Sequence, residues 1–253
     1  MTRDDLVKRA NAGRPLSDVA LVDFHAHMGP YYNFHIPFND AAGMLASMNA
    51  LGIDATLVCP HMAIGPDFRD GNDTALKACL DFPGRFLGAI GINPNYPEMR
   101  AIKLHPSLHE YDAGGESYRL VYSEAAERGL PVETHTWCGD GRCAPKAYEK
   151  IAGEYPETNF VLVHSGGVNK GIGEAIQVAE RRENVYLETS GSLTFDIVGK
   201  IVDRIGSRKL LFGSDNPFID PAAQVGKVVY APISRDAKLD VLGLNSKRLL
   251  GLP

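Results

Sequence analysis

The feature that most constrains the fold of this chain is a short apolar or β-branched run that recurs eight times. The starts of these runs are 34, 32, 15, 29, 30, 25 and 24 residues apart, and amphipathic stretches lie between most of them. A strand–helix–strand unit needs about 30 residues, so this pattern predicts parallel strands that alternate with helices. The runs cover residues 20–24, 54–59, 86–91, 101–105, 130–135, 160–164, 185–189 and 209–213.

Eight such units in 253 residues have the size of a closed (β/α)8 TIM barrel, which is the α/β fold that we predict. We expect a single domain over residues 1–253, with residues 1–19 as an N-terminal lead-in. Only nine residues separate Gly91 from Ala101, too few for a crossover helix, so the third and fourth strands should have a short or interrupted connection. Capping and stop signals predict helices over 39 or 40 to 52, 72 or 73 to 83, 116–129, 144–153, 170–182, 194–205, 221–229 and 234–249.

Composition and charge exclude several classes of partner. The net charge is −5, whereas a nucleic-acid-binding protein normally shows a basic footprint. The chain has no apolar run of 18 residues and no signal peptide at its N-terminus, so we expect neither a membrane span nor secretion. Its four cysteines form no CxxC pair and are expected to be free thiols. These features predict a cytoplasmic protein that binds a small-molecule substrate, with a homodimer as one possible assembly.

Chemically active side chains stand at the ends of several of the predicted strands. Five of the eight histidines of the chain occur there, together with a lysine and an aspartate. Because the active sites of (β/α)8 barrels lie at the C-terminal ends of the strands, these residues are the candidate functional site. They are His25, His27, Lys103, His105, His135, His164 and Asp215.

The spacing of the first two histidines predicts a metal site. Side chains two residues apart on a strand point the same way, so His25 and His27 can bind one cation. His135 and Asp215 would complete the ligand shell, and Asp23 would orient an imidazole. Such ligands suit Zn²⁺ best, with Mn²⁺, Fe²⁺ or Co²⁺ as alternatives. An HxH pair by itself is also compatible with two hydrogen-bonded loop histidines.

The chain resembles the amidohydrolase superfamily over nearly its whole length, from Val22 to residues 245–252. The similar branch is "amidohydrolase 2", which includes enzymes like aminocarboxymuconate-semialdehyde decarboxylase. The resemblance rests on the segments VDFHAH, AIKLHP, VETH, VLVHSGG and LLFGSDNPF, which occur in this order. It implies a metal-dependent (β/α)8 barrel whose metal ligands match His25, His27, His135 and Asp215.

The resemblance also implies roles for His164 and Lys103. His164 matches a histidine that acts on substrate in one-metal members and binds the second ion in two-metal members. Lys103 lies where two-metal members often carry a carbamylated lysine that bridges both ions, so one or two ions per chain are possible. A protonated lysine amine is a poor ligand, and the alternative is that Lys103 pairs with an acidic side chain or contacts a substrate carboxylate.

The favoured function is a metal-dependent hydrolase that opens an amide, lactone or ester of a small substrate with activated water. In this interpretation Asp215 takes and returns the proton, and His164 polarises the substrate carbonyl. The alternative is non-oxidative decarboxylation of an aromatic or unsaturated acid at the same residues. A third possibility is a barrel that binds a metal or ligand without catalysis.

Further side chains after the strands are candidates for substrate binding. His105, Trp137, Tyr32 and Arg142 form this predicted set, with Arg142 as the partner of a substrate carboxylate. Other aromatic residues of the loop at 31–38, together with His61, would make the pocket partly aromatic. Such residues also serve for plain loop packing.

Overall fold

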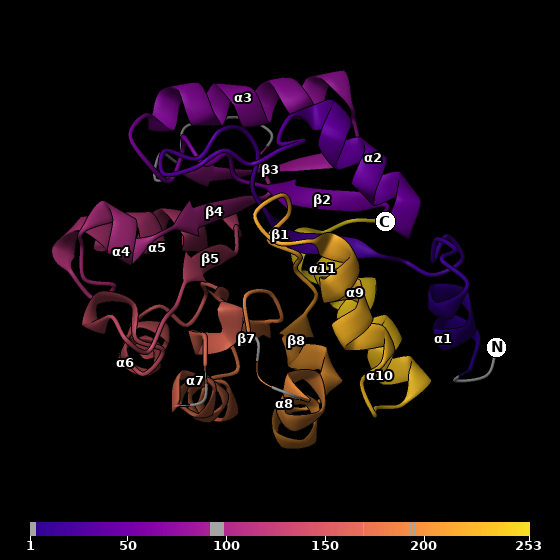
Figure 1. Ribbon diagram of the computed structural model, residues 1–253. Coiled ribbons are helices and arrows are strands. Elements are labelled where there is room, and N and C mark those ends of the chain that lie inside the picture. The colour runs from indigo at the N-terminus through magenta and orange to yellow at the C-terminus, as the bar shows by residue number, and fades with distance from the viewer. Residues whose placement is uncertain (1–3, 92–98, 169, 193, 195) are drawn as a thin grey trace.

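The computed structural model describes residues 4–91, 99–168, 170–192, 194 and 196–253. Eight parallel strands form one sheet in the order in which they occur in the chain, and helices surround it (Figure 1). The strands are β1 (Val22–Ala26), β2 (Ala55–Val58), β3 (Phe86–Gly91), β4 (Ala101–Leu104), β5 (Val132–His135), β6 (Phe160–Val163), β7 (Val185–Glu188) and β8 (Leu210–Leu211).

Backbone hydrogen bonds join the last strand to the first. The amide of Phe24 donates to the carbonyl of Phe212 over 2.9 Å, and Ala26 forms a parallel bridge with Asn216. The sheet is therefore a nearly closed barrel, and the predicted (β/α)8 TIM barrel is confirmed.

The helices follow the strands around the outside of the barrel (Figure 1). The α-helices are α1 (Asp4–Asn11), α2 (Ala41–Leu51), α3 (Phe68–Asp81), α4 (Pro106–His109), α5 (Glu116–Arg128), α6 (Ala147–Glu154), α7 (Lys170–Arg181), α8 (Ile197–Ile205), α9 (Pro221–Val229), α10 (Arg235–Leu239) and α11 (Asn245–Leu250). A π-helical turn over Asp240–Leu244 joins α10 to α11, where one continuous helix was predicted. The N-terminal lead-in contains α1, whose Leu6 is buried.

Helix α3 begins earlier than the sequence predicted. The side chain of Asp67 accepts hydrogen bonds from the amides of Arg69 and Asp70, which makes Asp67 the N-cap. Asn72 was predicted as a cap but is buried within the helix, where its amide group bonds the backbone N–H and C=O of Gly91 at 2.9 and 3.2 Å. A long-range contact with the end of β3 therefore explains this asparagine.

The connection between β3 and β4 is short in the chain, yet the two strands pair directly. Ala89 is in register with Ala101, and Gly91 with Lys103. Residues 92–98, on which the prediction of a short or interrupted connection falls, lie outside the described residues.

The described core has a large buried cluster, a smaller one, and a group of three residues, Ala75, Ile90 and Met99. The larger cluster joins strand residues such as Leu104 and Leu162 to helix residues such as Met44 and Tyr118, so it lies between sheet and helices. The smaller cluster joins apolar side chains of β1, β2, β3, β4, β6 and β8, which are different strands of one barrel. The strands also bury charged side chains, and these side chains belong to the candidate site.

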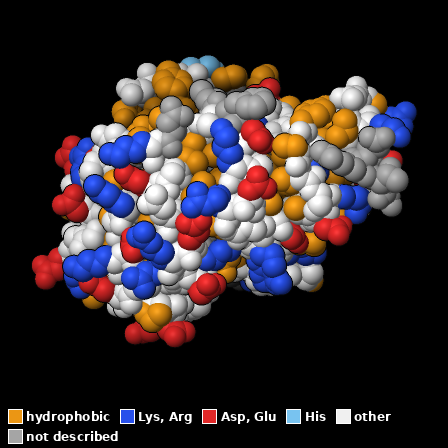
Figure 2. Space-filling model, turned by 90° about the horizontal axis from the view of Figure 1, so that it is seen from below, with side chains coloured by type: hydrophobic (Ala, Val, Ile, Leu, Met, Phe, Trp, Pro, Cys, Tyr) orange, Lys and Arg blue, Asp and Glu red, His pale blue; other side chains and the backbone are white. Residues whose placement is uncertain are grey.

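The surface and the cysteines agree with the composition. Lysine and arginine side chains are interspersed with acidic ones over the face seen in Figure 2. Among the described residues, no helix is both long enough and apolar enough to cross a membrane. The four cysteines are free, as predicted, and two of them are buried.

Candidate metal centre

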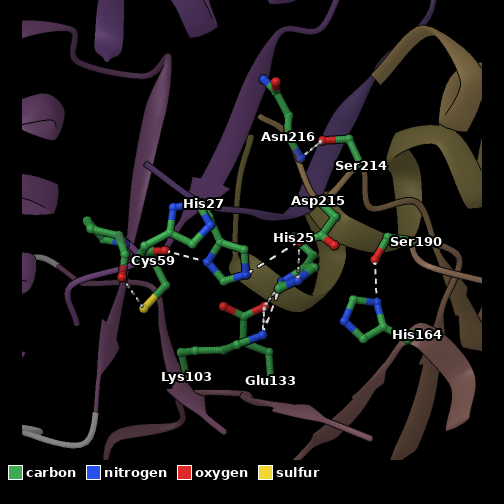
Figure 3. Close-up of polar contacts among 12 residues, drawn as sticks. His25, His27, Cys59, Lys103, Glu133, His164, Ser190, Ser214, Asp215 and Asn216 are labelled. Atoms are coloured by element: carbon green, nitrogen blue, oxygen red, sulfur yellow. Dashed lines mark hydrogen bonds and ion pairs between the residues drawn. The ribbon is translucent and has the colours of Figure 1, made fainter. Parts of the chain in front are cut away.

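The ends of β1 and β8 bring three potential metal ligands together (Figure 3). The ligand atoms of His25, His27 and Asp215 lie within 4.8 Å of one another, and all three residues are buried. Asp215 Oδ1 is 3.4 Å from His25 Nε2 and 3.5 Å from His27 Nε2. Two ligands of one Zn²⁺ ion, each bonded at about 2.0–2.2 Å in a tetrahedral site, lie roughly 3.3–3.6 Å apart. Asp215 Oδ1 therefore has the spacing of a co-ligand to each of the two histidine nitrogens.

Hydrogen bonds fix which ring nitrogen of each histidine faces this site. His25 Nδ1 lies 3.0 Å from Glu133 Oε2, and His27 Nδ1 lies 2.7 Å from the carbonyl oxygen of Cys59. Both partners accept, so both Nδ1 atoms carry a proton, and Nε2 is the ring nitrogen that each histidine turns toward Asp215. His25 Nε2 is buried and has no hydrogen-bond partner among the described residues. A buried ring nitrogen without a hydrogen-bond partner, beside a carboxylate, fits a site for a divalent cation.

The charges around His25 favour a cation there. Burial and the Lys103 ammonium lower the pKa of His25, but the nearby carboxylates of Asp215 and Glu133 outweigh them and raise it to about 9. By contrast, burial and the neighbouring His25 hold the pKa of His27 well below its usual value. In the absence of an ion, a proton therefore takes the place of a cation between His25 and Asp215.

Backbone contacts between β1 and the segment after β8 position the aspartate. The amide of Asp215 donates to the carbonyl of His25 over 2.8 Å, and the amide of His27 donates to the carbonyl of Asn216 over 2.7 Å. Asp215 adopts a left-handed conformation with φ of 58°, as does His164 with φ of 63°. Non-glycine residues rarely adopt this conformation, and such strain concentrates at functional sites.

Asp23 has a different role from the predicted one. Its carboxylate accepts hydrogen bonds from the backbone and hydroxyl of Ser214 at 2.9 and 2.5 Å and from the backbone of His25 at 3.1 Å. Burial raises the pKa of Asp23 to about 7. Asp23 therefore joins β1 to the segment after β8, and Glu133 is the carboxylate that orients an imidazole.

Lys103 lies on the Glu133 side of His25. Its Nζ is 3.3 Å from His25 Nδ1 and 4.0 Å from Glu133 Oε2, and the side chain is buried. The ring nitrogen that it approaches is not the one that faces Asp215. This placement favours the alternative in which the lysine pairs with an acidic side chain over the one in which it bridges two ions.

A cavity of about 250 Å³ opens onto two of the three ligands, His27 and Asp215. Three further predicted site residues also line it, and so does His61; the three are His105, His135 and His164. The residues that line it are His27, Tyr31, His61, Ile64, His105, Leu108, His135, His164, Asp215 and Phe218.

His135, predicted as a metal ligand, lies across this cavity from β1. It does not belong to the group of atoms within 4.8 Å that His25, His27 and Asp215 form. Its ring stacks on that of His105 at a centroid distance of 3.9 Å, and its pKa is lowered to about 3 by burial and by Lys103. The ring of His164 is 4.9 Å from it.

The ring of His164 is held by Ser190, which follows β7, and through it by Glu188, the last residue of β7. Its Nδ1 lies 3.0 Å from the hydroxyl of Ser190, which donates its own proton to Glu188 Oε2 over 2.7 Å. The hydroxyl therefore accepts from Nδ1–H, and His164 Nε2 presents a lone pair. Burial lowers the pKa of His164 well below its usual value. A neutral ring in this tautomer can take up a proton or bind a cation, whereas the predicted polarisation of a carbonyl needs an N–H at Nε2.

Three of the four predicted substrate-binding residues do not line the cavity. Trp137 packs against Gly167, where a Cβ atom would lie 2.5 Å from the indole ring. Tyr32 is 61% exposed, and its neighbour Tyr31 lines the cavity in its place. Arg142 binds Asp140 through two nitrogens, at 3.0 and 2.9 Å.

Two carboxylates of the site were absent from the predicted set. Glu133 stands two residues before His135 on β5, and strand alternation could have placed it on the same inward face. Glu188 ends β7, but its connection to His164 depends on the contact between β6 and β7, which strand periodicity does not reveal.

The amidohydrolase profile of the amidohydrolase-2 group matches residues 22–252. The chain belongs to the amidohydrolase-2 family. This amidohydrolase matches no curated protein sequence significantly.

Solved structures similar to this amidohydrolase have different activities. One is 2,6-dihydroxybenzoate decarboxylase from Rhizobium, with 16% identity, a TM-score of 0.68 and coverage of 92% of this chain and 99% of that one. A second is 5-carboxyvanillate decarboxylase from Novosphingobium aromaticivorans, complexed with manganese. It has 12% identity and a TM-score of 0.71, and the match covers 94% of this chain and 97% of that one. A third is a probable 2-pyrone-4,6-dicarboxylic acid hydrolase from Acinetobacter baumannii. It has 14% identity and a TM-score of 0.70, and the match covers 92% of this chain and 100% of that one. At such identities the similarity establishes the fold and leaves the reaction open.

Proposed function

We propose that this amidohydrolase is a metal-dependent hydrolase of a small amide, lactone or ester. The observation that carries the proposal is the buried group of His25, His27 and Asp215, with its orphaned Nε2 atom, at the floor of a cavity. A divalent ion held there would supply Lewis acidity to a water molecule or a carbonyl oxygen. Zn²⁺ suits these ligands, and the manganese bound by a structural neighbour makes Mn²⁺ the main alternative.

The protonation states of the cavity residues support hydrolysis. A hydrolase must take a proton from water and return it to the leaving group. Asp215 and His164 Nε2 both present lone pairs to the same cavity, and burial keeps His164 neutral by lowering its pKa. Asp215 would accept the proton of water, and His164 is placed to share it. The protonation of a substrate carbon, which a decarboxylase performs, would instead need an acid at this position.

The size and lining of the cavity indicate the substrate. An apolar cavity of about 150 Å³ can hold benzene, so about 250 Å³ admits a ring with a few substituents. No lysine or arginine is among the described residues that line it, which disfavours a dicarboxylate. The apolar and aromatic part of the lining is formed by Tyr31, Ile64, Leu108 and Phe218. We therefore infer a neutral or singly charged substrate with an apolar face.

Decarboxylation of a small aromatic acid is the second candidate. Tyr31 and Phe218 form an edge-to-face pair with centroids 5.7 Å apart at the cavity wall, which suits an aromatic ring. Two structural neighbours carry the names of decarboxylases that act on such acids. A metal and a ring-binding wall serve either reaction, so the products must distinguish them.

The test offers purified, metal-loaded protein a panel of small lactones, esters and amides beside hydroxybenzoates. We expect opening of a neutral lactone or ester and no release of CO₂. Release of CO₂ without the opening of any ester, lactone or amide would replace the hydrolase with the decarboxylase. Asp215→Asn should abolish either activity, so it serves as the control that the observed turnover belongs to this site.

A further inference from the structure

His105 differs from the other histidines of the cavity in the nitrogen that carries its proton. It follows β4 and caps the short helix α4, where its Nδ1 accepts a hydrogen bond from the amide of Leu108 over 3.2 Å. A backbone amide can only donate, so Nδ1 holds a lone pair. The ring proton of His105 is therefore on Nε2.

Three other cavity histidines have the opposite tautomer. The Nδ1 atoms of His27 and His61 bond to the carbonyl oxygens of Cys59 and Gly29, and that of His164 bonds to the Ser190 hydroxyl. Each of these rings therefore presents a lone pair from Nε2. Among the cavity histidines whose Nδ1 contact the structure describes, His105 is the one that offers an N–H.

The position of His105 places this donor opposite the metal ligands. The sheet order is β1 to β8, so β4 lies across the barrel mouth from β8, which leads to Asp215. Both residues line the same cavity. The stacked ring of His135, at 3.9 Å and an interplanar angle of 12°, fixes the plane of the His105 ring without taking its Nε2 proton.

We propose that His105 Nε2–H donates the hydrogen bond that holds the substrate oxygen on which negative charge develops. This inference rests on the proposed hydrolase function and assigns to β4 the carbonyl-binding role that His164 cannot fill in its tautomer. A donor placed in advance toward a developing oxyanion stabilises the transition state more than the ground state. Loss of one such donor lowers kcat by about 10²–10³-fold.

Two substitutions separate this role from helix capping. In His105→Asn, the Asn Oδ1 atom can still accept from the Leu108 amide, since asparagine is a favoured N-cap, but no donor reaches the position of Nε2. In His105→Gln, the longer amide can place an N–H near that position, whereas the cap is weakened. We expect His105→Asn to lose activity without a change in melting temperature, and His105→Gln to melt earlier while it keeps more activity.

The binding of a probe tests the proposal without turnover. The probe is phenylphosphonate, whose tetrahedral oxygens resemble the developing oxyanion, titrated calorimetrically into Zn²⁺-loaded protein. We expect affinity to fall at least about tenfold in His105→Asn, which is the loss of one charge-assisted hydrogen bond, and less in His105→Gln. Equal affinity in His105→Asn and wild type, or no binding to wild type, would overturn the proposal.

The tautomer itself can be measured by ¹⁵N NMR of the histidine rings, with His105→Asn assigning the signal. We expect an Nε2–H tautomer for His105 and Nδ1–H tautomers for His61 and His164. An Nδ1–H tautomer for His105 would refute the inference whatever reaction the protein catalyses. A failure of the hydrolase assignment would instead appear as CO₂ release in the substrate panel, with the tautomers and the phosphonate affinities unchanged.

Discussion

The histidines on the two sides of the barrel mouth are chemically alike but differ in their surroundings. At the β1–β8 side, the Nε2 atoms of His25 and His27 face the Asp215 carboxylate, and a proton or a cation is held between His25 and Asp215. At the β4–β5 side, His105 and His135 stack as neutral rings, because burial holds the pKa of each below its usual value. The partner of the other ring nitrogen and the nearest carboxylate therefore decide whether a histidine binds a cation or contacts substrate.

The largest effect should come from removing a ligand on the β1–β8 side. His25→Ala or His27→Ala should lower metal affinity by more than about 100-fold, beyond the loss typical of an outer-shell change, and abolish turnover. The fold should survive because a chain of this length buries a sufficient core without a metal. Elemental analysis and circular dichroism would check both statements. Full metal occupancy in the double variant would show that these histidines are not ligands.

A smaller loss of metal affinity is expected when the hydrogen bond that orients the His25 ring is weakened. Glu133→Gln keeps the shape of the side chain but removes the charge that holds His25 Nδ1–H. Metal affinity should fall about 10–100-fold, measured by competition with a chelator. Glu149→Gln, which changes an exposed ion pair with Arg181, is the matched control and should leave affinity unchanged. A loss of stability without a loss of affinity in Glu133→Gln would make this carboxylate merely structural.

Metal affinity at the β1–β8 side should also depend on pH. Metal binding must displace the proton from His25, whose pKa is about 9 without an ion. Affinity should therefore rise with pH, by about tenfold per pH unit for one displaced proton, and level off above about pH 9. Isothermal titration with Zn²⁺ in buffers of different ionisation enthalpy would count the protons released. An affinity that does not change between about pH 7 and pH 8.5 would contradict the assigned pKa.

The smallest effect should follow changes outside the cavity. Arg142 binds Asp140 and is 41% exposed, so Arg142→Ala should alter kcat/KM less than about twofold. Steady-state kinetics on whichever substrate the panel identifies would measure it. A selective rise in KM for a substrate that bears a carboxylate would restore Arg142 as a substrate-binding residue.

Much of this site could be predicted because strand periodicity is a local property. The alternation of side chains placed His25 and His27 on one face, and the recurrent apolar runs placed all strand ends at one rim. The Glu133 contact with His25 spans 108 residues, and each histidine tautomer depends on a partner from another segment. Such pairings arise only when the strands are assembled. The start of α3 was predicted too late for the same reason, since Asn72 bonds Gly91 on a neighbouring strand.

The most direct test of the central claim is an anomalous difference map from a crystal of the Zn²⁺-loaded protein. We expect one strong peak about 2.0–2.2 Å from His25 Nε2, His27 Nε2 and an oxygen of Asp215, with Glu133 still bonded to His25 Nδ1. A peak on the β4–β5 side, bound by His105 or His135 and not by this group, would contradict it. So would a fully loaded protein whose ion lies outside the cavity.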